Sequence, residues 1–473
     1  MAEEKELTAE DVADIKKRLS TFLEPFRDSF ERHEQALHAA VYIEGRLRKL
    51  ARRTIEPIAN DNQLKRRPLQ HFIGAGKWED DGLRKEMVRQ IGADMGRENG
   101  VLILDGSGFH KSGPESVGTQ RQWCGRLGKE EQCQVGEFLA YAAGGSVTLL
   151  DCELYLPKWW VDDENRREKC HVPEDVTFKA GWELAAGMVF RHRENVPHSW
   201  VVGDENYGRP TELRDLFARE GEQYVLEVSA DAKVRLVRGG EWTTANRWAA
   251  ELPRSAWRSF SVRDGERGPI TVRAVKTRVY TQRTNKGVAE RPEILLIVRN
   301  DRDNKTWTYL ASDVKAPLRE LVRVGSCRHG IEQALEMGKG DVGLDEYEVR
   351  SWVGWHHHMT LSIMALWFLV QEQRWLKKKG WLLPSRRFGE FWPSSSPSRE
   401  PPNNSRRGRT RKRAATTAPV TTTGRADATG RRPGFKSEHR WTDFGLILQL
   451  ALVVRISHSP TSSGASAKTS PSS

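Results

Sequence analysis

The sequence predicts an α/β protein in which a helical N-terminal region (residues 1–97) precedes a mixed-sheet core (98–383) and a basic tail (384–473). Three observations predict this order. Apolar residues recur at helical spacing in the first part. In the second part, short apolar runs alternate with helical segments, as in a sheet covered by helices. In the third part, Ser, Pro, Thr and Arg dominate without a core-forming pattern, which predicts disorder.

The composition of the 473-residue chain bounds its class. Single cores stop growing at about 250–300 residues, so more than one domain is expected. No run of 18 apolar residues occurs, which excludes a transmembrane span, and the charged N-terminus lacks an apolar signal segment. Five cysteines without a Cys-x-x-Cys pair indicate reduced thiols. We therefore expect a cytoplasmic protein with no membrane partner.

The net charge of +12 lies almost entirely in the tail. Residues 384–473 hold 16 basic and 5 acidic groups, which leaves residues 1–383 with a net charge of only +1. A basic excess indicates a polyanionic partner. The tail is therefore expected to bind DNA phosphates without sequence preference, or else to act as a solubilising run.

Residues 1–97 are expected to form a helical DNA-binding domain. A capping box over residues 8–11 precedes a helical pattern from Val12 to Leu23, and two further helices are predicted over 36–55 and 81–96. Clustered basic residues on the second helix suit a DNA-binding surface, and a solvated helix face has equal weight. The basic residues of this cluster are Arg46, Arg48, Lys49, Arg52 and Arg53.

The core begins at Gly100 with a buried strand that ends at Asp105 and is followed by a turn. Residues 133–157 predict two strands joined through a glycine pair. A later apolar run ends in a second acid, Asp204, and lies between two predicted helices. Four short alternating runs predict a β-rich insertion over residues 232–312. Helical character returns from about residue 315 to 379.

Acids at strand ends indicate where chemistry takes place. A carboxylate at the edge of a core is costly unless it is compensated, and a divalent cation is the usual compensator. On the helix that follows the insertion, Arg328, Glu332 and Lys339 fall within about 40° of one another, because each residue turns the helix by about 100°. A cation, an acid and a cation on one face suit a site that holds metal and phosphate together.

These residues give the chain a resemblance to the DDE transposases of bacterial insertion sequences that carry a Y-(2)-R-(3)-E-(6)-K signature. Arg328, Glu332 and Lys339 match its R-(3)-E-(6)-K part, while VLILDGSGFHKSG and VVGDENYG resemble the segments of the two aspartates. The resemblance spans about residues 10–380. It implies a ribonuclease-H-like core with a β-rich insertion before the third acid. The signature tyrosine falls at Gly325.

The resemblance implies a transposase that cuts and joins double-stranded DNA with two Mg²⁺ ions, for which Mn²⁺ could substitute. Asp105, Asp204 and Glu332 would be the catalytic residues and metal ligands, and Arg328 and Lys339 would bind the DNA backbone. One ion would activate water and later a 3′-hydroxyl, and the other would stabilise the leaving oxygen. Pairing of two DNA ends implies a homodimer on DNA, associated with the bacterial nucleoid.

Alternatives accompany these assignments. The protein could be a relic that only binds DNA, because the signature tyrosine is missing, or a metal-dependent nuclease without strand transfer. Asp105 has the alternative of a simple turn residue, Glu205 competes with Asp204, and Glu336 competes with Glu332. A further strand-end acid, Asp151, is expected to face solvent in a hairpin.

The three histidines at 356–358 point about 100° apart on a helix, so they cannot share one ion. We expect them to pack in the protein or to face DNA. Trp123, Trp159, Trp352 and Trp355 could stack on an extruded base, although core packing is the more common role of a tryptophan.

Overall fold

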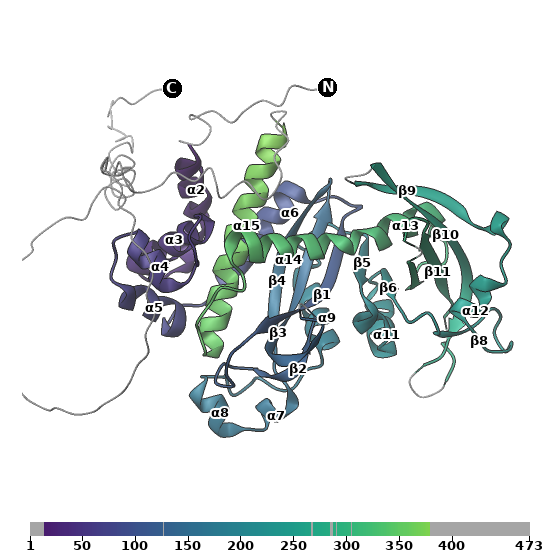
Figure 1. Cartoon of the computed structure of the whole chain (residues 1–473), viewed down its shortest axis with the longest axis horizontal. Coiled ribbons are helices and arrows are strands. Elements are labelled where there is room, and N and C mark those ends of the chain that lie inside the picture. Colours follow the sequence, from purple (N-terminus) through teal and green to yellow (C-terminus); the bar gives the residue numbers. More distant parts are fainter. Residues whose placement is uncertain are drawn as a thin grey trace, which may run out of the picture. The chain divides into compact units, whose positions relative to one another are not determined.

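The computed structural model describes residues 14–378 except 126, 266–267, 284–286, 290 and 304, and it has the mixed α/β architecture expected from the sequence (Figure 1). The predicted capping box at residues 8–11 and the predicted disordered tail lie outside the described residues. All five cysteines are free thiols, as expected. No helix of the described part is long and apolar enough to cross a membrane.

Within the described residues, the strands join in one mixed sheet of order β2-β3-β1-β5-β6-β12-β11-β10-β7-β8, with β4 paired to β3 and β9 to β10. The core strands are β1 (Val101–His110), β2 (Gln120–Cys124), β3 (Lys129–Ala143), β4 (Ser146–Tyr155), β5 (Trp200–Gly203) and β6 (Tyr224–Glu227). The insertion contributes β7 (Lys233–Arg235), β8 (Thr243–Thr244), β9 (Arg258–Gly265), β10 (Gly268–Thr281), β11 (Glu293–Asn300) and β12 (Thr306–Ala311). Strands β1, β5 and β6 run parallel, and β12 pairs with β6 in the antiparallel direction.

Two predictions about the first strands have opposite outcomes. The hairpin of β3 and β4 is confirmed, and its glycine pair, Gly144 and Gly145, has the positive φ angles of 57° and 75° that a tight turn requires. The predicted turn after Asp105 is wrong. Strand β1 continues to His110 because the long strand β3 pairs with it along its whole length.

The N-terminal region is helical, and its helices pack in the same hydrophobic cluster as the sheet. The helices are α2 (Ile15–Leu23), the 3₁₀-helix η1 (Glu24–Ser29), α3 (His33–Leu47), α4 (Ile55–Asp61), α5 (Arg66–Ala75) and α6 (Asp81–Met95). The single helix predicted over 36–55 is wrong, since α3 ends at Leu47 and Arg48 already has an extended backbone. The role of residues 1–97 as a separate DNA-binding domain stays a prediction.

Two arginines of the predicted basic cluster are structural. Arg46 is fully buried and donates hydrogen bonds to backbone carbonyls, including that of Glu346 at 3.0 Å. Arg48 is buried and forms ion pairs with Glu44 and Asp61. Neither the DNA-binding nor the solvated-face interpretation therefore applies to these two side chains, because both of them hold the segment between α3 and α4 in place.

The remaining helices are α7 (Lys158–Val161), α8 (Glu164–Lys169), α9 (Gly181–His192), α10 (Glu205–Gly208), α11 (Thr211–Glu220), α12 (Ala245–Ala250), the 3₁₀-helix η2 (Arg254–Ala256), α13 (Leu318–Cys327), α14 (His329–Val342) and α15 (Trp352–Lys378). Helix α14 runs across the sheet and contacts β1, β3 and β4 (Figure 1). It covers the face to which odd-numbered residues of β1 point, because its Gly330 lies against Ile103. Helix α9 covers the opposite face, where its Gly181 lies against Glu137.

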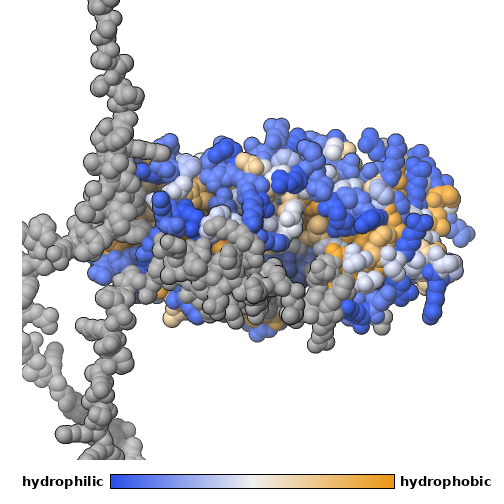
Figure 2. All heavy atoms as spheres, turned by 90° about the horizontal axis from the view of Figure 1, so that it is seen from above, coloured by the Kyte–Doolittle hydropathy of each residue, from blue (hydrophilic) through white to orange (hydrophobic). Residues whose placement is uncertain are grey.

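The insertion extends the sheet and also has a hydrophobic cluster of its own, which includes Val234, Val279, Leu295 and Ile297. Figure 2 shows hydrophobic side chains gathered at the end of the molecule that holds the insertion, while the other visible parts of that face are mostly hydrophilic. The four short runs predicted as strands correspond to β9, β10, β11 and β12.

Candidate active site

The two predicted aspartates come at equivalent positions of two neighbouring parallel strands. In the register of β1 and β5, Leu104 pairs with Gly203. Asp105 follows Leu104 within β1, and Asp204 comes directly after the end of β5. Asp204 also caps α10, since its carboxylate accepts a hydrogen bond of 2.9 Å from the backbone N–H of Asn206. The rival acid Glu205 is exposed. The sheet thus brings the two candidate residues together at one point.

A third acid continues this row and was not predicted. Gly203 pairs with Leu226 in the register of β5 and β6, so Glu227 stands beside Asp204. The sequence signal was present, because YVLE is an apolar run that ends in an acid, like the runs before the two aspartates. We name Asp105, Asp204 and Glu227 the acid row.

The signature residues Arg328 and Glu332 lie over the acid row, at the junction of α13 and α14. The guanidinium of Arg328 donates a hydrogen bond of 2.8 Å to Glu332 and forms an ion pair of 3.4 Å with Glu227. Glu332 is also 2.9 Å from the ring nitrogen Nδ1 of His329. Its side chain is 44% exposed, so it can change partners without unpacking the core.

The electrostatics of the site show an excess of negative charge. Burial and the charges of Asp204 and Glu332 together raise the pKa of Asp105 to about 7, against the opposing effect of Arg328. Burial likewise raises the pKa values of Asp204 and Glu227. Arg328 interacts with all four carboxylates, and its pKa is raised in turn. One guanidinium therefore does not balance the site, and a further cation would be stabilised there.

The donor set fits a divalent metal, because adjacent carboxylates are the hard oxygen ligands that Mg²⁺ prefers. Among the residues that the structure describes, no three His, Cys, Asp or Glu side chains are close enough together to hold an ion. Asp105 and Asp204 could supply two ligands, whereas Glu332 is turned toward Arg328 and His329. For Glu332 to become the third ligand, its carboxylate would have to leave Arg328 and His329 and turn toward Asp105 and Asp204.

Lys339 lies two turns beyond Glu332 on α14 and reaches back to β1. Its ammonium group donates a hydrogen bond of 2.7 Å to the hydroxyl of Ser107, two residues beyond Asp105. A groove of about 750 Å³ runs along this helix. It is lined by Ala51, Arg52, Glu332, Leu335, Glu336, Lys339, Gly340, Asp345 and Glu346. The groove leads to the third signature acid, and the basic residues Arg52 and Lys339 both line it.

On the opposite face of the sheet, a buried pair supports the loop that carries Asp204. Tyr207 of α10 donates a hydrogen bond to the carboxylate of Glu137 on β3, and both side chains are buried. Burial raises the pKa of Glu137, and the hydrogen bond from Tyr207 opposes that rise. The pair fixes α10 beside the sheet, which in turn holds Asp204 at its position.

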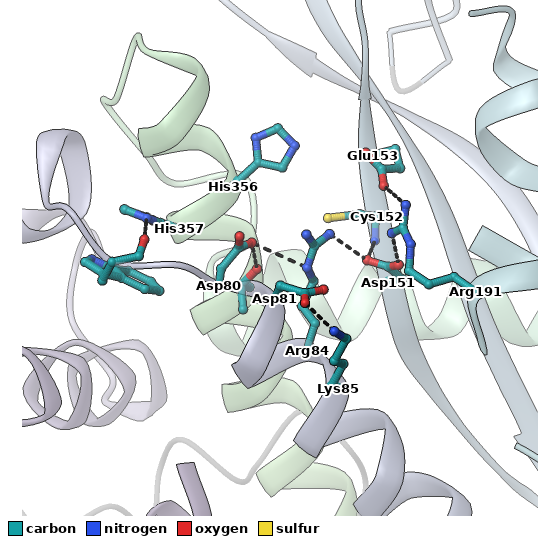
Figure 3. Close-up of polar contacts among 12 residues, drawn as sticks. Asp80, Asp81, Arg84, Lys85, Asp151, Cys152, Glu153, Arg191, His356 and His357 are labelled. Carbon is teal, nitrogen blue, oxygen red and sulfur yellow. Dashed lines mark hydrogen bonds and ion pairs between the residues drawn. The ribbon is translucent and has the colours of Figure 1, made fainter. Parts of the chain in front are cut away.

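Asp151 belongs to a separate, buried network (Figure 3). Its carboxylate accepts hydrogen bonds from Arg84 at 3.2 Å and from Arg191 at 2.7 Å, and lies 2.7 Å from His192. Arg84 also pairs with Asp80, so the network joins α6, β4 and α9. The prediction of a solvent-facing Asp151 is wrong, because partners distant in sequence enclose it completely.

The three histidines at 356–358 pack inside the protein. His357 stacks on Trp78 with the ring centroids 3.6 Å apart, and His358 is within 2.9 Å of the hydroxyl of Tyr42. The packing interpretation is thus confirmed for this segment. Of the tryptophans considered for base stacking, Trp355 is fully buried, whereas Trp123 is 64% exposed.

Two comparisons with known proteins identify what the chain is similar to. The family model described as "DDE superfamily endonuclease" matches residues 25–269, a range that includes Asp105 and Asp204 and ends before Glu332. A curated relative, described as a probable transposase for insertion sequence element IS701 from Microchaete diplosiphon, is 22% identical over 316 residues. That alignment covers 64% of this chain and 74% of the relative.

Proposed function

The chain belongs to the DDE superfamily of endonucleases, and on this premise we propose that it is a transposase that cuts double-stranded DNA at the ends of an insertion sequence and joins them to target DNA. The resemblance on which this was predicted is confirmed at the level of the family. The observation that carries the proposal is the side-by-side placement of Asp105 and Asp204, with Glu332 over them. A ribonuclease-H-like core is part of the proposal. It is supported by the order β4-β3-β1-β5-β6, in which an antiparallel meander leads into parallel strands.

Asp105 and Asp204 would hold the metal, and Glu332 would complete the second site after leaving Arg328. Divalent cations are general in this superfamily, and two Mg²⁺ ions, or Mn²⁺ in their place, would stabilise the attacking and leaving oxygens of an in-line displacement. The raised pKa of Asp105 supports this assignment, since the acid row favours an added positive charge.

Arg328 and Lys339 would bind the phosphates beside the scissile bond. The guanidinium of Arg328 already pairs with the carboxylates of Glu227 and Glu332. A DNA phosphate that binds Arg328 would take the place of one of these carboxylates. The same exchange would release Glu332 toward the acid row. Lys339 would give up Ser107 in the same way. A homodimer assembled on two DNA ends, in the bacterial nucleoid, completes the proposal.

The test uses the full chain, labelled duplex DNA with the sequences that flank the coding region, and a target plasmid. We expect nicking and strand transfer in Mg²⁺ and none in EDTA. Asp204→Ala should lower nicking at least about 100-fold, because it removes a ligand of the reacting centre. The exposed neighbour Glu205 provides the matched control, and Glu205→Ala should keep the wild-type rate.

Other outcomes identify the alternatives. Nicking without strand transfer would indicate a nuclease, and end-specific binding without nicking would indicate a relic. If wild type and Asp204→Ala nick equally, the assignment of the site is wrong.

A further inference from the structure

Tyr309 is the neighbour of the acid row on the fourth strand. In the antiparallel register of β6 and β12, Tyr309 pairs directly with Glu227. Directly paired residues point to the same face of a sheet. The row therefore runs from Asp105 on β1, past Asp204 at the end of β5, to Glu227 on β6 and Tyr309 on β12. The side chain of Tyr309 is buried at 5% exposure.

The ring of Tyr309 lies against Gly325, where the signature of the family has its tyrosine. A Cβ atom placed on Gly325 would lie 3.5 Å from both Cε2 and Cζ of the Tyr309 ring. This is ordinary van der Waals contact, so a methyl group fits at position 325. A larger side chain there would extend from a Cβ that already touches the Tyr309 ring, so we expect an aromatic group at position 325 to compete with that ring for space.

Tyr309 lies close enough to the charged groups of the site for their charges to act on its phenol. Burial raises the pKa of Tyr309 above its usual value, the charge of Glu227 raises it further, and that of Arg328 lowers it. Glu332 also acts on it. The phenol thus shares its surroundings with both carboxylates that Arg328 holds.

We propose that Tyr309 supplies, from β12, the tyrosine that the signature places at position 325, and that it acts as a positioning residue for Arg328 and Glu227. The proposal rests on the proposed function of the site. It explains why a chain with Gly325 keeps the other signature residues: a tyrosine on α13 and Tyr309 on β12 are mutually exclusive occupants of one space. Removal of the first allows the second.

A double-mutant cycle tests whether the two positions share that space. Gly325→Tyr alone should lower the Tm and reduce cleavage at least about tenfold, because two rings collide. Gly325→Tyr combined with Tyr309→Ala should restore both the Tm and cleavage to within about threefold of wild type. Gly325→Ala is the matched control and should behave as wild type, since only a methyl group is added. If Gly325→Tyr has equal effects in the wild-type protein and in the Tyr309→Ala variant, the two positions do not share the space.

Tyr309→Phe tests the phenol separately from the ring. It keeps the packing against Gly325, so the Tm should stay within about 1 °C of wild type. Cleavage at saturating DNA should fall about fivefold while the Kd for end DNA, measured in EDTA, stays unchanged, because the phenol positions groups that act in the reaction. An unchanged cleavage rate would contradict a positioning role for the phenol.

The two proposals fail in different ways. If wild type does not cut, or if Asp204→Ala cuts equally well, the proposed function fails. The Tm cycle needs neither metal nor cleavage, so it still decides whether Tyr309 occupies the place of a side chain at 325. If the cycle shows no coupling while wild type cuts and Asp204→Ala does not, only the inference on Tyr309 is wrong.

Discussion

Lys339 on α14 donates a hydrogen bond of 2.7 Å to Ser107 on β1, which ties the last signature residue to the strand that carries Asp105. The bond joins residues 232 positions apart in the sequence. In the free protein, the ammonium group is therefore already aimed at the site where the scissile phosphate is proposed to bind.

This relationship separates two roles of Lys339. Lys339→Ala should weaken binding of end DNA and reduce the salt dependence of binding by about one phosphate contact. Ser107→Ala removes the same hydrogen bond but keeps the charge, so DNA affinity should stay within about twofold of wild type. Fluorescence anisotropy at several salt concentrations measures both. Equal losses for the two variants would mean that Lys339 acts through the bond to β1 and not through phosphate.

The raised pKa of Asp105 predicts a pH-dependent stability of the metal-free protein. The folded state binds a proton near pH 7 that the unfolded chain has already lost, so this stabilisation is complete at acid pH and disappears as the pH rises through about 7. Between pH 5 and 8, Asp105→Asn should flatten the fall of the Tm. At pH 8 it should raise the Tm by about 2–4 °C, as roughly 1 kcal/mol would. If the Tm of wild type and that of Asp105→Asn depend on pH in the same way, the pKa of Asp105 is not raised.

The Asp151 network predicts a strong effect on folding without a role in DNA cleavage chemistry. Asp151→Ala leaves Arg84, Arg191 and the buried His192 without their shared carboxylate, and loss of one partner from a buried charge network typically costs about 3–5 kcal/mol. Glu153→Gln, which removes the charge of the other partner of Arg191, is the matched control and should cost about 1 kcal/mol or less. Urea unfolding measures the free energy of unfolding of both variants. Similar losses for the two would contradict a stabilising role of Asp151 at the centre of the network.

The same network has a pH signature. The hydrogen bond from His192 and the charges of Arg84 and Arg191 hold the pKa of Asp151 well below its usual value, against the effect of burial. Its stabilisation is therefore present above the unfolded pKa near 3.8 and is lost only as the pH falls below that value. Above pH 5, the titration of Asp151 itself should add no pH dependence to the difference in unfolding free energy between wild type and Asp151→Ala, as measured by urea unfolding.

The distribution of charge predicts the effect of removing residues 384–473. These residues carry a net charge of +11, so their deletion should flatten the salt dependence of non-specific DNA binding. Metal-dependent nicking should persist, because the proposed site lies wholly within residues 105–339. Loss of nicking on deletion would show that the tail contributes to the reaction.

The sequence predicted the local features of the site better than the contacts between residues that are far apart in the chain. The apolar runs that end in Asp105 and Asp204 identified both acids as candidates, and the parallel pairing of β1 and β5 places them at equivalent positions. The same signal could have identified Glu227. Strands β9 to β12 of the insertion were likewise predicted from alternation alone, whereas β7 and β8 were not.

Long-range pairing explains what the sequence did not predict. Asp151 and Arg46 look like surface residues in their own segments, yet their partners Arg84 and Glu346 come from elsewhere in the chain. The contact of Tyr309 with Gly325 depends on how α13 crosses β12, and no local pattern encodes that crossing. Strand β1 passes Asp105 without a turn because β3 pairs with it.

The insertion is hydrogen-bonded to the acid row through β12 and β6, so it is a continuation of the sheet and not an appendage on a linker. Strand β6 has the parallel strand β5 on one side and the antiparallel strand β12 on the other. The position of Glu227 on β6 therefore depends on the pairing of the insertion as well as on that of the core strands.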